Sequence, residues 1–519
     1  MKFLRLNILH IIISLLILIF LLSPIIFLLF NSIDFISKEL SYLLEIHLYD
    51  YSFNTIYLIF LTLFFSIFFS IIPSWIISTH KFKFRNLLDI LLYLPLSIPT
   101  YIMAYTYGDI LSFTGPIQFF FRKYLKDFSY IINNDYLQIE VLGIILALSL
   151  YPYLYASTRI AFSMIGSTYS NKAENLGMSD FYFFYKLLLP LSRPALLLGS
   201  FLIIMEVLND YGAVVYFGVN TFTSGIFRLW FSMGSEKSAV ILSLFLLTII
   251  LFLSLIENRI YNKSRFYFFS QNNSHNRLKK LNSKFFPFLF ISIPIFFGFI
   301  LPVSYLIFNA INTITELNHL FFVTLNSICL SSISATICVF ITLIFIFLNK
   351  FNSIYLSKFI EKIMSIGYTI PGAVIGLSFM ILISKFSILT SFSVLTYAYC
   401  FRFLAVAKSP IKSSYDKVPD DYKDLSNLLK LSKFSSLKKV YFPLTNKSVF
   451  IAFILVFIDI LKELPITLIL RPFNFDTLAS STYELASDEM LSESSIYSLL
   501  IVFISSFLLV FLKFYSDDR

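Results

Sequence analysis

Apolar stretches long enough to cross a lipid bilayer recur along the whole chain of 519 residues. A helix needs about 20 mostly apolar residues to cross the hydrocarbon core, because each residue adds only about 1.5 Å of length. The stretches predict helices near residues 8–30, 55–78, 87–112, 141–164, 187–209, 239–256, 285–309, 322–348, 363–384, 389–407, 444–467 and 492–512. With 58% hydrophobic and 13% charged residues, a water-soluble fold is excluded. We therefore predict an all-α polytopic membrane protein with about twelve transmembrane helices.

The positions of lysine and arginine predict how these helices are oriented. Positively charged flanks are retained on the cytoplasmic side during insertion. Basic residues collect before the first helix, after the second, sixth and eighth helices, and most densely between the tenth and eleventh, whereas the loop 31–54 is net acidic. Both termini are thus predicted to be cytoplasmic, and topology rather than nucleic-acid binding explains the net charge of +10. The first apolar stretch is longer than a signal-peptide core and lacks a small-residue cleavage site, so we expect it to remain as a membrane anchor.

The two halves of the chain repeat each other. Three pairs of residues are related by an offset of 253 (443 − 190, for example): Pro190 and Pro443, Glu206 and Asp459, and Asp210 and Glu463. Upstream, Asn54 pairs with Asn326 and Pro99 with Pro371 at an offset of 272 (371 − 99), so the first half carries an insertion, which we place near 115–138. Each half has an even number of helices, so both halves keep the same orientation about an axis along the membrane normal. This geometry predicts two parallel six-helix repeats with a central pathway between them.

A loop with a defined pattern lies between the expected fourth and fifth helices, and a second copy lies between the tenth and eleventh. The first copy comprises Asn171, Lys172, Ala173 and Glu174, then Gly177, and Pro190 at the start of the next apolar stretch. The second copy comprises Asp424, Leu425 and Ser426, then Lys430, and Pro443. We call them the first and second repeat loops. The pattern predicts a short helix, a turn that glycine permits, a second helix, and a proline that begins a membrane helix.

Both repeat loops resemble the cytoplasmic coupling loops of type I ABC importer permeases, whose pattern is Glu-Ala-Ala, three residues, Gly, nine residues, and Ile-x-Leu-Pro. The resemblance implies a type I ABC importer permease fold and a cytoplasmic ATP-binding partner, in two copies, whose closure tilts the loops and their helices. Asn171 and Lys172 replace the Glu and Ala of this pattern, and Lys430 replaces the Gly in the second copy. The alternative interpretation is that both are ordinary amphipathic surface helices.

The stretches after the expected fifth and eleventh helices resemble ferric iron importer permeases in particular. The first is Asn-Asp-Tyr-Gly-Ala-Val-Val-Tyr-Phe-Gly-Val-Asn-Thr-Phe-Thr at 209–223. The second is Lys-Glu-Leu-Pro-Ile-Thr-Leu-Ile-Leu-Arg-Pro-Phe at 462–473, followed by Asp-Thr-Leu-Ala at 476–479. The resemblance covers nearly the whole chain, and it implies a permease of the bacterial inner membrane that receives ferric iron from a periplasmic iron-binding protein. The fused format of two units is shared with thiamine permeases, so it does not fix the substrate.

On this basis the chain divides into six segments. They are an N-terminal transmembrane helix and periplasmic loop (1–53), a first permease unit (54–257), a basic cytoplasmic linker (258–284), a seventh helix and loop (285–321), a second permease unit (322–513) and a cytoplasmic tail (514–519).

Four carboxylates are candidates for the translocation pathway: Glu206, Asp210, Asp459 and Glu463. In each half the two acidic residues are four positions apart on a helix, so they project from one face. Acidic residues inside a membrane are costly and usually face a cavity, and hard oxygen ligands suit a hard cation such as Fe³⁺. One hypothesis is that they line the exit from the binding protein into the pore, without a stable metal site. The alternative is that they lie at hydrated helix ends, where they shape the gate or pair with Lys462 and Arg471.

No catalytic group is expected in this chain. The phosphate-binding pattern G-x-x-x-x-G-K-[ST] is absent, so we expect no bound cofactor and assign ATP and Mg to the partner ATPase. The three cysteines, Cys329, Cys338 and Cys400, lack metal-ligand spacing. Two alternatives remain: the same architecture carrying thiamine, sulfate or a polyamine, and a proton- or sodium-coupled secondary transporter of six plus six helices. A membrane enzyme is a more distant alternative, since no reactive constellation lies on one face.

Overall fold

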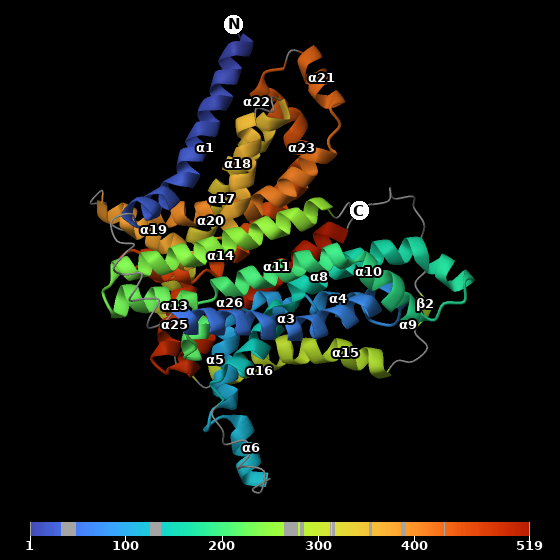
Figure 1. The fold of residues 1–519 in the computed structure, drawn as a ribbon, viewed down its shortest axis with the longest axis vertical. Coiled ribbons are helices and arrows are strands. Elements are labelled where there is room, and N and C mark those ends of the chain that lie inside the picture. The colour runs from blue at the N-terminus through green and yellow to red at the C-terminus, as the bar shows by residue number, and fades with distance from the viewer. Residues whose placement is uncertain are drawn as a thin grey trace. The chain divides into compact units, whose positions relative to one another are not determined.

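The computed structural model describes residues 2–32, 48–124, 136–263, 279–280, 285–311, 313, 317–351, 355–385, 391–429 and 431–517 (Figure 1). Within these residues the fold is helical, apart from the two-residue strands β1 (His80–Lys81) and β2 (Lys279–Lys280), which pair in parallel. The contacts divide the chain into two compact units. Unit 1 comprises Met1–Leu40, Ser235–Leu244 and Glu316–Ser481, and unit 2 comprises Ser41–Gly234, Phe245–Thr315 and Thr482–Arg519.

Unit 2 contains most of the first half of the chain and two segments that come later. Its helices from the first half are α3 (Leu48–Thr79), α4 (Arg85–Leu91), η1 (Leu94–Ser97), α5 (Thr100–Leu111), α6 (Pro116–Tyr124), α8 (Ile139–Asn175), α9 (Asp180–Phe183), η3 (Phe184–Leu188), α10 (Leu189–Leu191), α11 (Arg193–Asn209), α12 (Gly212–Tyr216), α13 (Phe222–Phe227) and η4 (Arg228–Ser232). Its later helices are α15 (Phe285–Ile295), η5 (Phe296–Ile300), α16 (Leu301–Ile311) and α26 (Leu491–Asp517).

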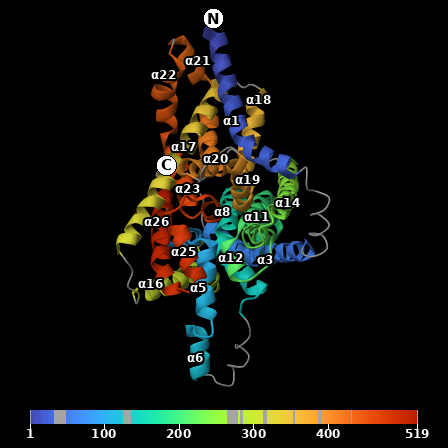
Figure 2. The ribbon, with the colours of Figure 1, turned by 90° about the vertical axis from the view of Figure 1, so that its left-hand side faces the viewer.

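Unit 1 contains the first helix of the chain and most of the second half. Its helices are α1 (Lys2–Ser32), α17 (Leu317–Phe351), α18 (Tyr355–Ile366), η6 (Gly367–Thr369), α19 (Gly372–Lys385), α20 (Phe392–Lys417), α21 (Asp421–Leu428), α22 (Lys433–Ser436), η7 (Leu437–Tyr441), α23 (Phe442–Leu461) and α24 (Pro465–Leu470). Two more helices, α14 (Glu236–Lys263) and α25 (Leu478–Ser487), begin in unit 1 and end in unit 2. Within unit 1, α21 and α22 lie at the same end as the start of α1 (Figures 1 and 2).

The first helix of each half packs in the unit that is built mainly from the other half. In unit 1, α1 packs against α17, α18 and α19. The Tyr397 hydroxyl group on α20 donates to the Phe20 carbonyl group at 2.7 Å and lies 2.7 Å from the Ser23 hydroxyl group. In unit 2, α15 packs against α3, and α16 packs against α5, where Tyr305 donates to Asp109 at 2.9 Å. Such hydrogen bonds fix neighbouring helices in a membrane, because lipid offers polar groups no partner.

Small side chains allow the most extensive helix pair of unit 2, α3 against α8, to approach closely. The face that α3 buries includes the small hydroxyl residues Thr62, Ser66, Ser70 and Ser74. Their spacing of four residues keeps them on one side of the helix. On α8, a Cβ atom at Gly143 would lie only 2.7 Å from the Cβ atom of Leu61. Close backbone packing of this kind drives helix association in lipid, where burial of apolar surface gains little.

Eight helices of the described residues are long and apolar enough to cross a membrane, and three bent helix pairs raise the number to as many as eleven spans. All eleven overlap segments that the sequence predicted, and the prediction of an all-α polytopic fold is confirmed. The remaining expected segment, 389–407, corresponds to α20. This helix packs against α17 and α23 and is made more polar by Arg402 and Lys408. The count of twelve therefore stays a prediction.

The third expected helix of each half is broken at a proline. The helices before and after Pro99 meet at 91°, and those before and after Pro371 meet at 108°. Ile98 and Ile370, which precede these prolines, have extended backbones with ψ angles of 114° and 126°. A proline ring disfavours the helical conformation of the residue before it, which favours a helix end at these positions. The two breaks occupy equivalent positions in the two halves, as the repeat requires.

Substitution of Gly143 tests the close approach of α3 and α8. The added Cβ atom would force the helices apart, so we expect Gly143→Ala to lower the free energy of unfolding by about 1–3 kcal/mol. Gly166 on the same helix is the control, because its added Cβ atom would meet only the Thr79 Cγ2 atom at 3.6 Å. Gly166→Ala should be neutral or gain up to about 1 kcal/mol from helix propensity. Unfolding of the purified protein in detergent measures both, and equal effects would contradict the packing argument.

Candidate functional site

The first repeat loop is a helix, a turn and a second helix. The last turns of α8 carry Asn171, Lys172, Ala173 and Glu174. Gly177 then adopts φ of +69°, a left-handed conformation that costs glycine no steric energy. The Met178 N–H group donates to the Ala173 carbonyl group at 3.0 Å, which closes the helix end. Ser179 starts α9 by accepting a hydrogen bond from the Tyr182 N–H group at 3.3 Å.

The second repeat loop has the same hydrogen bonds at the equivalent positions of the second half. The Leu431 N–H group donates to the Ser426 carbonyl group at 3.1 Å. Ser432 starts α22 by accepting from the Ser435 N–H group at 3.2 Å. Of the residues predicted in this loop, α21 carries Asp424, Leu425 and Ser426, and Lys430 lies outside the described residues. The internal repeat therefore includes individual hydrogen bonds, which occur at equivalent positions in both halves.

A π-helical turn joins each repeat loop to its membrane helix, η3 in the first and η7 in the second. Pro190 and Pro443 follow in the first turns of α10 and α23, where a missing N–H group costs nothing. Beyond this point the two halves differ. The first half bends by 67° between α10 and α11, because Pro194 in the first turn of α11 cannot donate a hydrogen bond to a preceding turn. Lys447 occupies the equivalent position in α23, which continues unbroken.

A small buried residue packs each repeat loop against its unit. Ala173 is 3% exposed and packs in an apolar cluster with Phe183 and Leu188. The equivalent residue, Ser426, is also 3% exposed, and its hydroxyl oxygen accepts from Ser436 at 3.0 Å. Each loop is therefore packed against its own unit through this residue.

A lysine fastens the start of the second repeat loop. Lys350 on α17 donates to the Val418 carbonyl group at 3.0 Å and pairs with the Asp420 carboxylate at 2.8 Å. The hydrogen bond from Lys350, together with its charge, lowers the pKa of Asp420 below its usual value. The pair is thus ionised at neutral pH, and its contribution to stability is lost only as the pH falls through that lowered pKa.

The opposite face of each repeat loop exposes two large apolar side chains at equivalent positions. In the first loop Leu176 is 73% and Phe181 is 70% exposed. In the second loop Leu429 is 69% and Phe434 is 74% exposed. The sequence analysis missed these four residues because it followed the polar and glycine positions of the loop pattern. The offset of 253 would have paired them, since it relates Leu176 to Leu429 and Phe181 to Phe434.

Two of the four candidate pathway carboxylates, Asp210 and Glu463, are buried at the ends of α11 and α23. Each is 6% exposed. One Asp210 oxygen accepts from the N–H groups of Ala213 and Val214 at 3.0 and 3.3 Å, at the start of α12. Glu463 accepts in the same way from the Ile466 N–H group at 3.3 Å, at the start of α24. The first N–H groups of a helix have no partner within the helix, so a carboxylate is stabilised there.

Asp210 and Glu463 have different side-chain neighbours that fill equivalent space in the two halves. The Thr100 side chain at the start of α5 lies close to the Asp210 carboxylate. The residue equivalent to Thr100 is Gly372, where an added Cβ atom would lie 2.6 Å from both the Arg402 Nη1 atom and the Glu463 carboxylate. Arg402 donates to Glu463 at 2.8 Å, and both side chains are buried. In the second half, the Arg402 and Glu463 side chains thus occupy the space that the Thr100 side chain fills in the first half.

The other two carboxylates, Glu206 and Asp459, are half-buried one helical turn earlier. The structure pairs Glu206 with Tyr153 at 3.4 Å, Asp459 with Lys462 at 3.9 Å, and Arg471 with Asp476 at 2.6 Å. Glu206 and Asp210 belong to unit 2, whereas Asp459 and Glu463 belong to unit 1. Convergence of all four carboxylates therefore stays a prediction. Among the described residues, no group of three or more His, Cys, Asp or Glu side chains is arranged to hold a metal ion.

Several tyrosines cluster in unit 2, and Tyr105 connects this cluster to Asp210. The hydroxyl groups of Tyr211 and Tyr483 lie 3.2 Å apart. Tyr105, which is 4% exposed, interacts electrostatically with Asp210, Tyr211 and Tyr483, and its ring contacts that of Tyr216. The sequence analysis treated the many aromatic residues as bulk, because residues so far apart in the chain give no common pattern. Phenol and carboxylate oxygens are hard ligands.

Comparison with known families defines the class of protein. Residues 66–265 match the family described as the inner membrane component of binding-protein-dependent transport systems. This range contains the whole first repeat loop and Asp210, and the second half repeats both at one offset. The chain is similar to this family over residues 66–265, and the family match and the apolar helices together support a multi-pass protein of the inner membrane.

Individual relatives transport different substrates. The Fe(3+)-transport system permease protein FbpB 2 of Haemophilus influenzae is 23% identical over 453 residues, covering 85% of this chain and 85% of the relative. The sulfate transport system permease protein CysT of Escherichia coli is 29% identical over 150 residues, covering 29% of this chain and 52% of the relative. The molybdenum transport system permease protein ModB of Escherichia coli is 25% identical over 172 residues, covering 32% and 72%. Of these three, the iron permease is similar through both halves.

The Arg402–Glu463 pair can be tested by removing one or both charges. Arg402→Met leaves a buried carboxylate without its cation, and we expect the free energy of unfolding to fall by about 3–5 kcal/mol. Combining it with Glu463→Met removes both charges and should recover most of this loss. As a control, Lys462→Met disrupts the longer pair with Asp459 and should cost less than about 1 kcal/mol. A double variant as unstable as the single Arg402→Met variant in detergent unfolding would show that the pair is not the cause.

Proposed function

We propose that this chain is the permease of an ATP-driven, binding-protein-dependent importer of ferric iron. The observation that carries the proposal is the pair of repeat loops, which share their hydrogen bonds at equivalent positions of the two halves. Duplicated rigid loops suit a chain that is moved by two copies of one partner. The chain is a translocation subunit, and a cytoplasmic ABC ATPase binds and hydrolyses ATP with Mg.

The exposed apolar side chains of the repeat loops are the proposed contacts with the ATPase. Each loop exposes two large apolar side chains, Leu176 and Phe181 in the first and Leu429 and Phe434 in the second. Large exposed apolar side chains on a surface that projects into water favour a protein partner. Two equivalent surfaces require two copies of that partner, one for each half.

Ferric iron is favoured over an oxyanion by the candidate pathway itself. Asp210 and Glu463 place carboxylates beside helix breaks, and Tyr105 adds a phenol group that interacts with Asp210. Carboxylate and phenol oxygens attract a hard trivalent cation and repel sulfate or molybdate. The similarity to the Fe(3+)-transport permease spans both halves, whereas the similarity to the sulfate and molybdenum permeases covers about a third of the chain. A periplasmic iron-binding protein would deliver the cation.

Both termini are assigned to the cytoplasm, on the side of the ATPase. In unit 1, the start of α1 lies at the same end as α21 and α22, which form the second repeat loop (Figures 1 and 2). In unit 2, Lys513 near the end of α26 contacts Asp89, which also binds Arg159 on the helix that leads into the first repeat loop. Transport then follows alternating access: ATP binding closes the ATPase dimer, the loops move with it, and the helices open the pathway to the other side.

Uptake of ferric iron tests the proposed function. Proteoliposomes that contain the permease with its ATPase, supplied with the binding protein and ferric iron, should take up iron only with ATP and both partners, and vanadate should inhibit uptake. Asp210→Asn should lower uptake by about tenfold, equivalent to about 1.4 kcal/mol on a barrier, with assembly unchanged. Glu463→Gln, alone and combined with Asp210→Asn, should also lower it. Uptake driven by an ion gradient without the ATPase would indicate a secondary transporter, and unchanged uptake by the variants would exclude these carboxylates from the pathway.

Capture of the ATPase tests the proposed contacts. Replacing Phe181 or Phe434 by aspartate places a charge in the apolar contact, so the amount of ATPase that co-purifies should fall by about tenfold or more. Phe84→Asp is a matched control, because this phenylalanine is 62% exposed but lies outside both repeat loops. Equal loss of ATPase with all three variants would mean that the loops are not the docking surface.

A further inference from the structure

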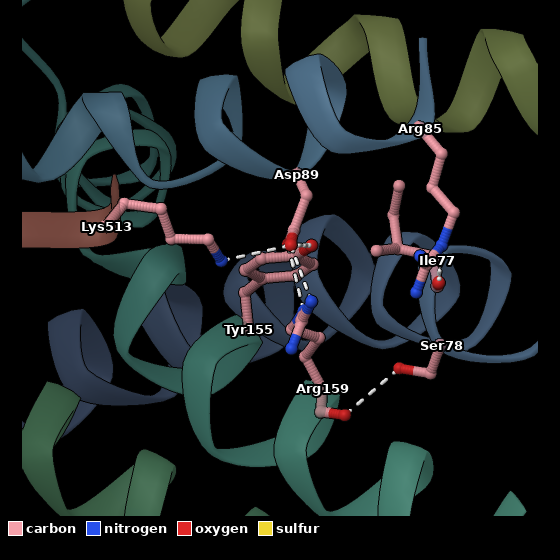
Figure 3. A network of polar contacts seen from close by, with 7 residues as sticks. All are labelled: Ile77, Ser78, Arg85, Asp89, Tyr155, Arg159 and Lys513. Atoms are coloured by element: carbon pink, nitrogen blue, oxygen red, sulfur yellow. Dashed lines mark hydrogen bonds and ion pairs between the residues drawn. The ribbon is translucent and has the colours of Figure 1, made fainter. Parts of the chain in front are cut away.

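A buried polar network lies in unit 2 around Asp89 on α4 (Figure 3). Asp89 is only 4% exposed. Its carboxylate accepts two hydrogen bonds from Arg159 on α8, from the Nε atom at 2.9 Å and from the Nη2 atom at 2.6 Å. Tyr155 on α8 donates at 2.6 Å, and Lys513 on α26 donates at 3.0 Å. A guanidinium group that binds both oxygens of a carboxylate fixes the distance and the orientation of the two helices.

Neighbouring main-chain contacts extend this network to α3. The Ser78 hydroxyl group donates to the Arg159 carbonyl group at 3.0 Å, and the Arg85 Nε atom donates to the Ile77 carbonyl group at 2.7 Å (Figure 3). Because Asp89 is buried and its partners are only partly exposed, their mutual attraction is stronger than at a surface.

The same ion pair recurs in unit 1. Glu361 on α18 pairs with Lys412 on α20 at 2.5 Å, and Lys408 donates to the Glu361 carbonyl group. The offset of 272 relates Asp89 to Glu361 (361 − 89), and the offset of 253 relates Arg159 to Lys412 (412 − 159). These are the offsets of the third and of the later helices in the two halves, so the two pairs occupy equivalent positions.

Each pair joins the helix of a repeat loop to a broken helix. In the first half, α8 ends in the first repeat loop, whereas α4 precedes the break at Pro99, beyond which Thr100 begins α5 close to Asp210. In the second half, α20 leads into the second repeat loop, whereas α18 precedes the break at Pro371, beyond which α19 begins against Glu463. Each acidic residue therefore connects a loop to the helix that reaches a candidate pathway carboxylate.

We propose that the Asp89–Arg159 and Glu361–Lys412 pairs are positioning pairs that transmit the movement of each repeat loop to the broken helix of the same half. The proposal rests on the function proposed above. When the loop moves α8 or α20, the ion pair carries α4 or α18 along, and with it the arm that leads to the proline break. Without the pair, the two helices can slide past each other, and the movement of the loop no longer reaches the pathway.

The first pair is the stronger link. Asp89 and Arg159 have side chains that are 6% and 24% exposed and are joined by two hydrogen bonds, whereas Glu361 and Lys412 are 18% and 37% exposed and are joined by one. Less burial and a single bond give a weaker ion pair. Substitutions in the first half should therefore have the larger effect.

The test measures iron uptake and ATP hydrolysis together in the complete transporter. Asp89→Asn should lower ferric iron uptake per ATP hydrolysed by at least about fivefold, the lower end of typical coupling between sites. The double variant Asp89→Glu with Arg159→Lys gives the first half the ion pair of the second, and it should restore most of the coupling. Lys513→Met is the matched control, because it removes a bond to the same carboxylate without separating α4 from α8, and its uptake per ATP should be unchanged.

Two results would overturn the proposal: uptake and hydrolysis that fall in equal proportion in Asp89→Asn, or uncoupling by Lys513→Met as large as that by Asp89→Asn. Either would mean that the network only stabilises the fold. Should Asp89→Asn not accumulate in the membrane, Arg159→Lys replaces it, since this variant keeps the charge and loses the two-pronged contact, and the same criteria apply. Failure of the proposed function is distinguishable, because the wild-type complex would then take up no ferric iron with ATP.

Discussion

Two prolines, Pro99 and Pro371, break a helix inside the membrane, and the polar interior of both units depends on how these breaks are stabilised. A break frees main-chain groups that lipid cannot satisfy, so the protein must supply partners for them. The Ser149 hydroxyl group donates to the Ile98 carbonyl group at 3.0 Å, on the residue before the first break. The helices that restart after the breaks begin beside Asp210 or Glu463. A helix start carries partial positive charge, so a buried carboxylate is tolerated at these positions.

The halves keep the same main-chain geometry while their side chains diverge. Capped turns, π-helical turns and broken helices recur at fixed offsets. The buried carboxylates do not have the same charge environment, since Arg402 forms an ion pair with Glu463, whereas main-chain N–H groups bind Asp210.

Local features of the fold and of the repeat loops could be predicted because they depend on neighbouring residues. Apolar length marked the membrane helices, and eleven of the expected segments overlap spans of the structure. The turn at Gly177 follows from the left-handed conformation that glycine permits. The sequence analysis omitted residues whose exposure is decided by tertiary packing. The exposed residues Leu176 and Phe181 belong to an unremarkable amphipathic pattern, and only the fold leaves them uncovered.

The sequence by itself determined that this chain is a duplicated helical membrane protein with a loop of defined geometry in each half, because hydrophobic length, proline and glycine act within a few turns of chain. Only the tertiary structure decided which charges meet. Arg402 forms an ion pair with Glu463, and Lys513 forms one with Asp89, although the partners of each pair lie far apart in the sequence. Such pairs depend on where two helices cross and on how deeply the side chains are buried there. A local pattern of residues cannot predict where two helices cross.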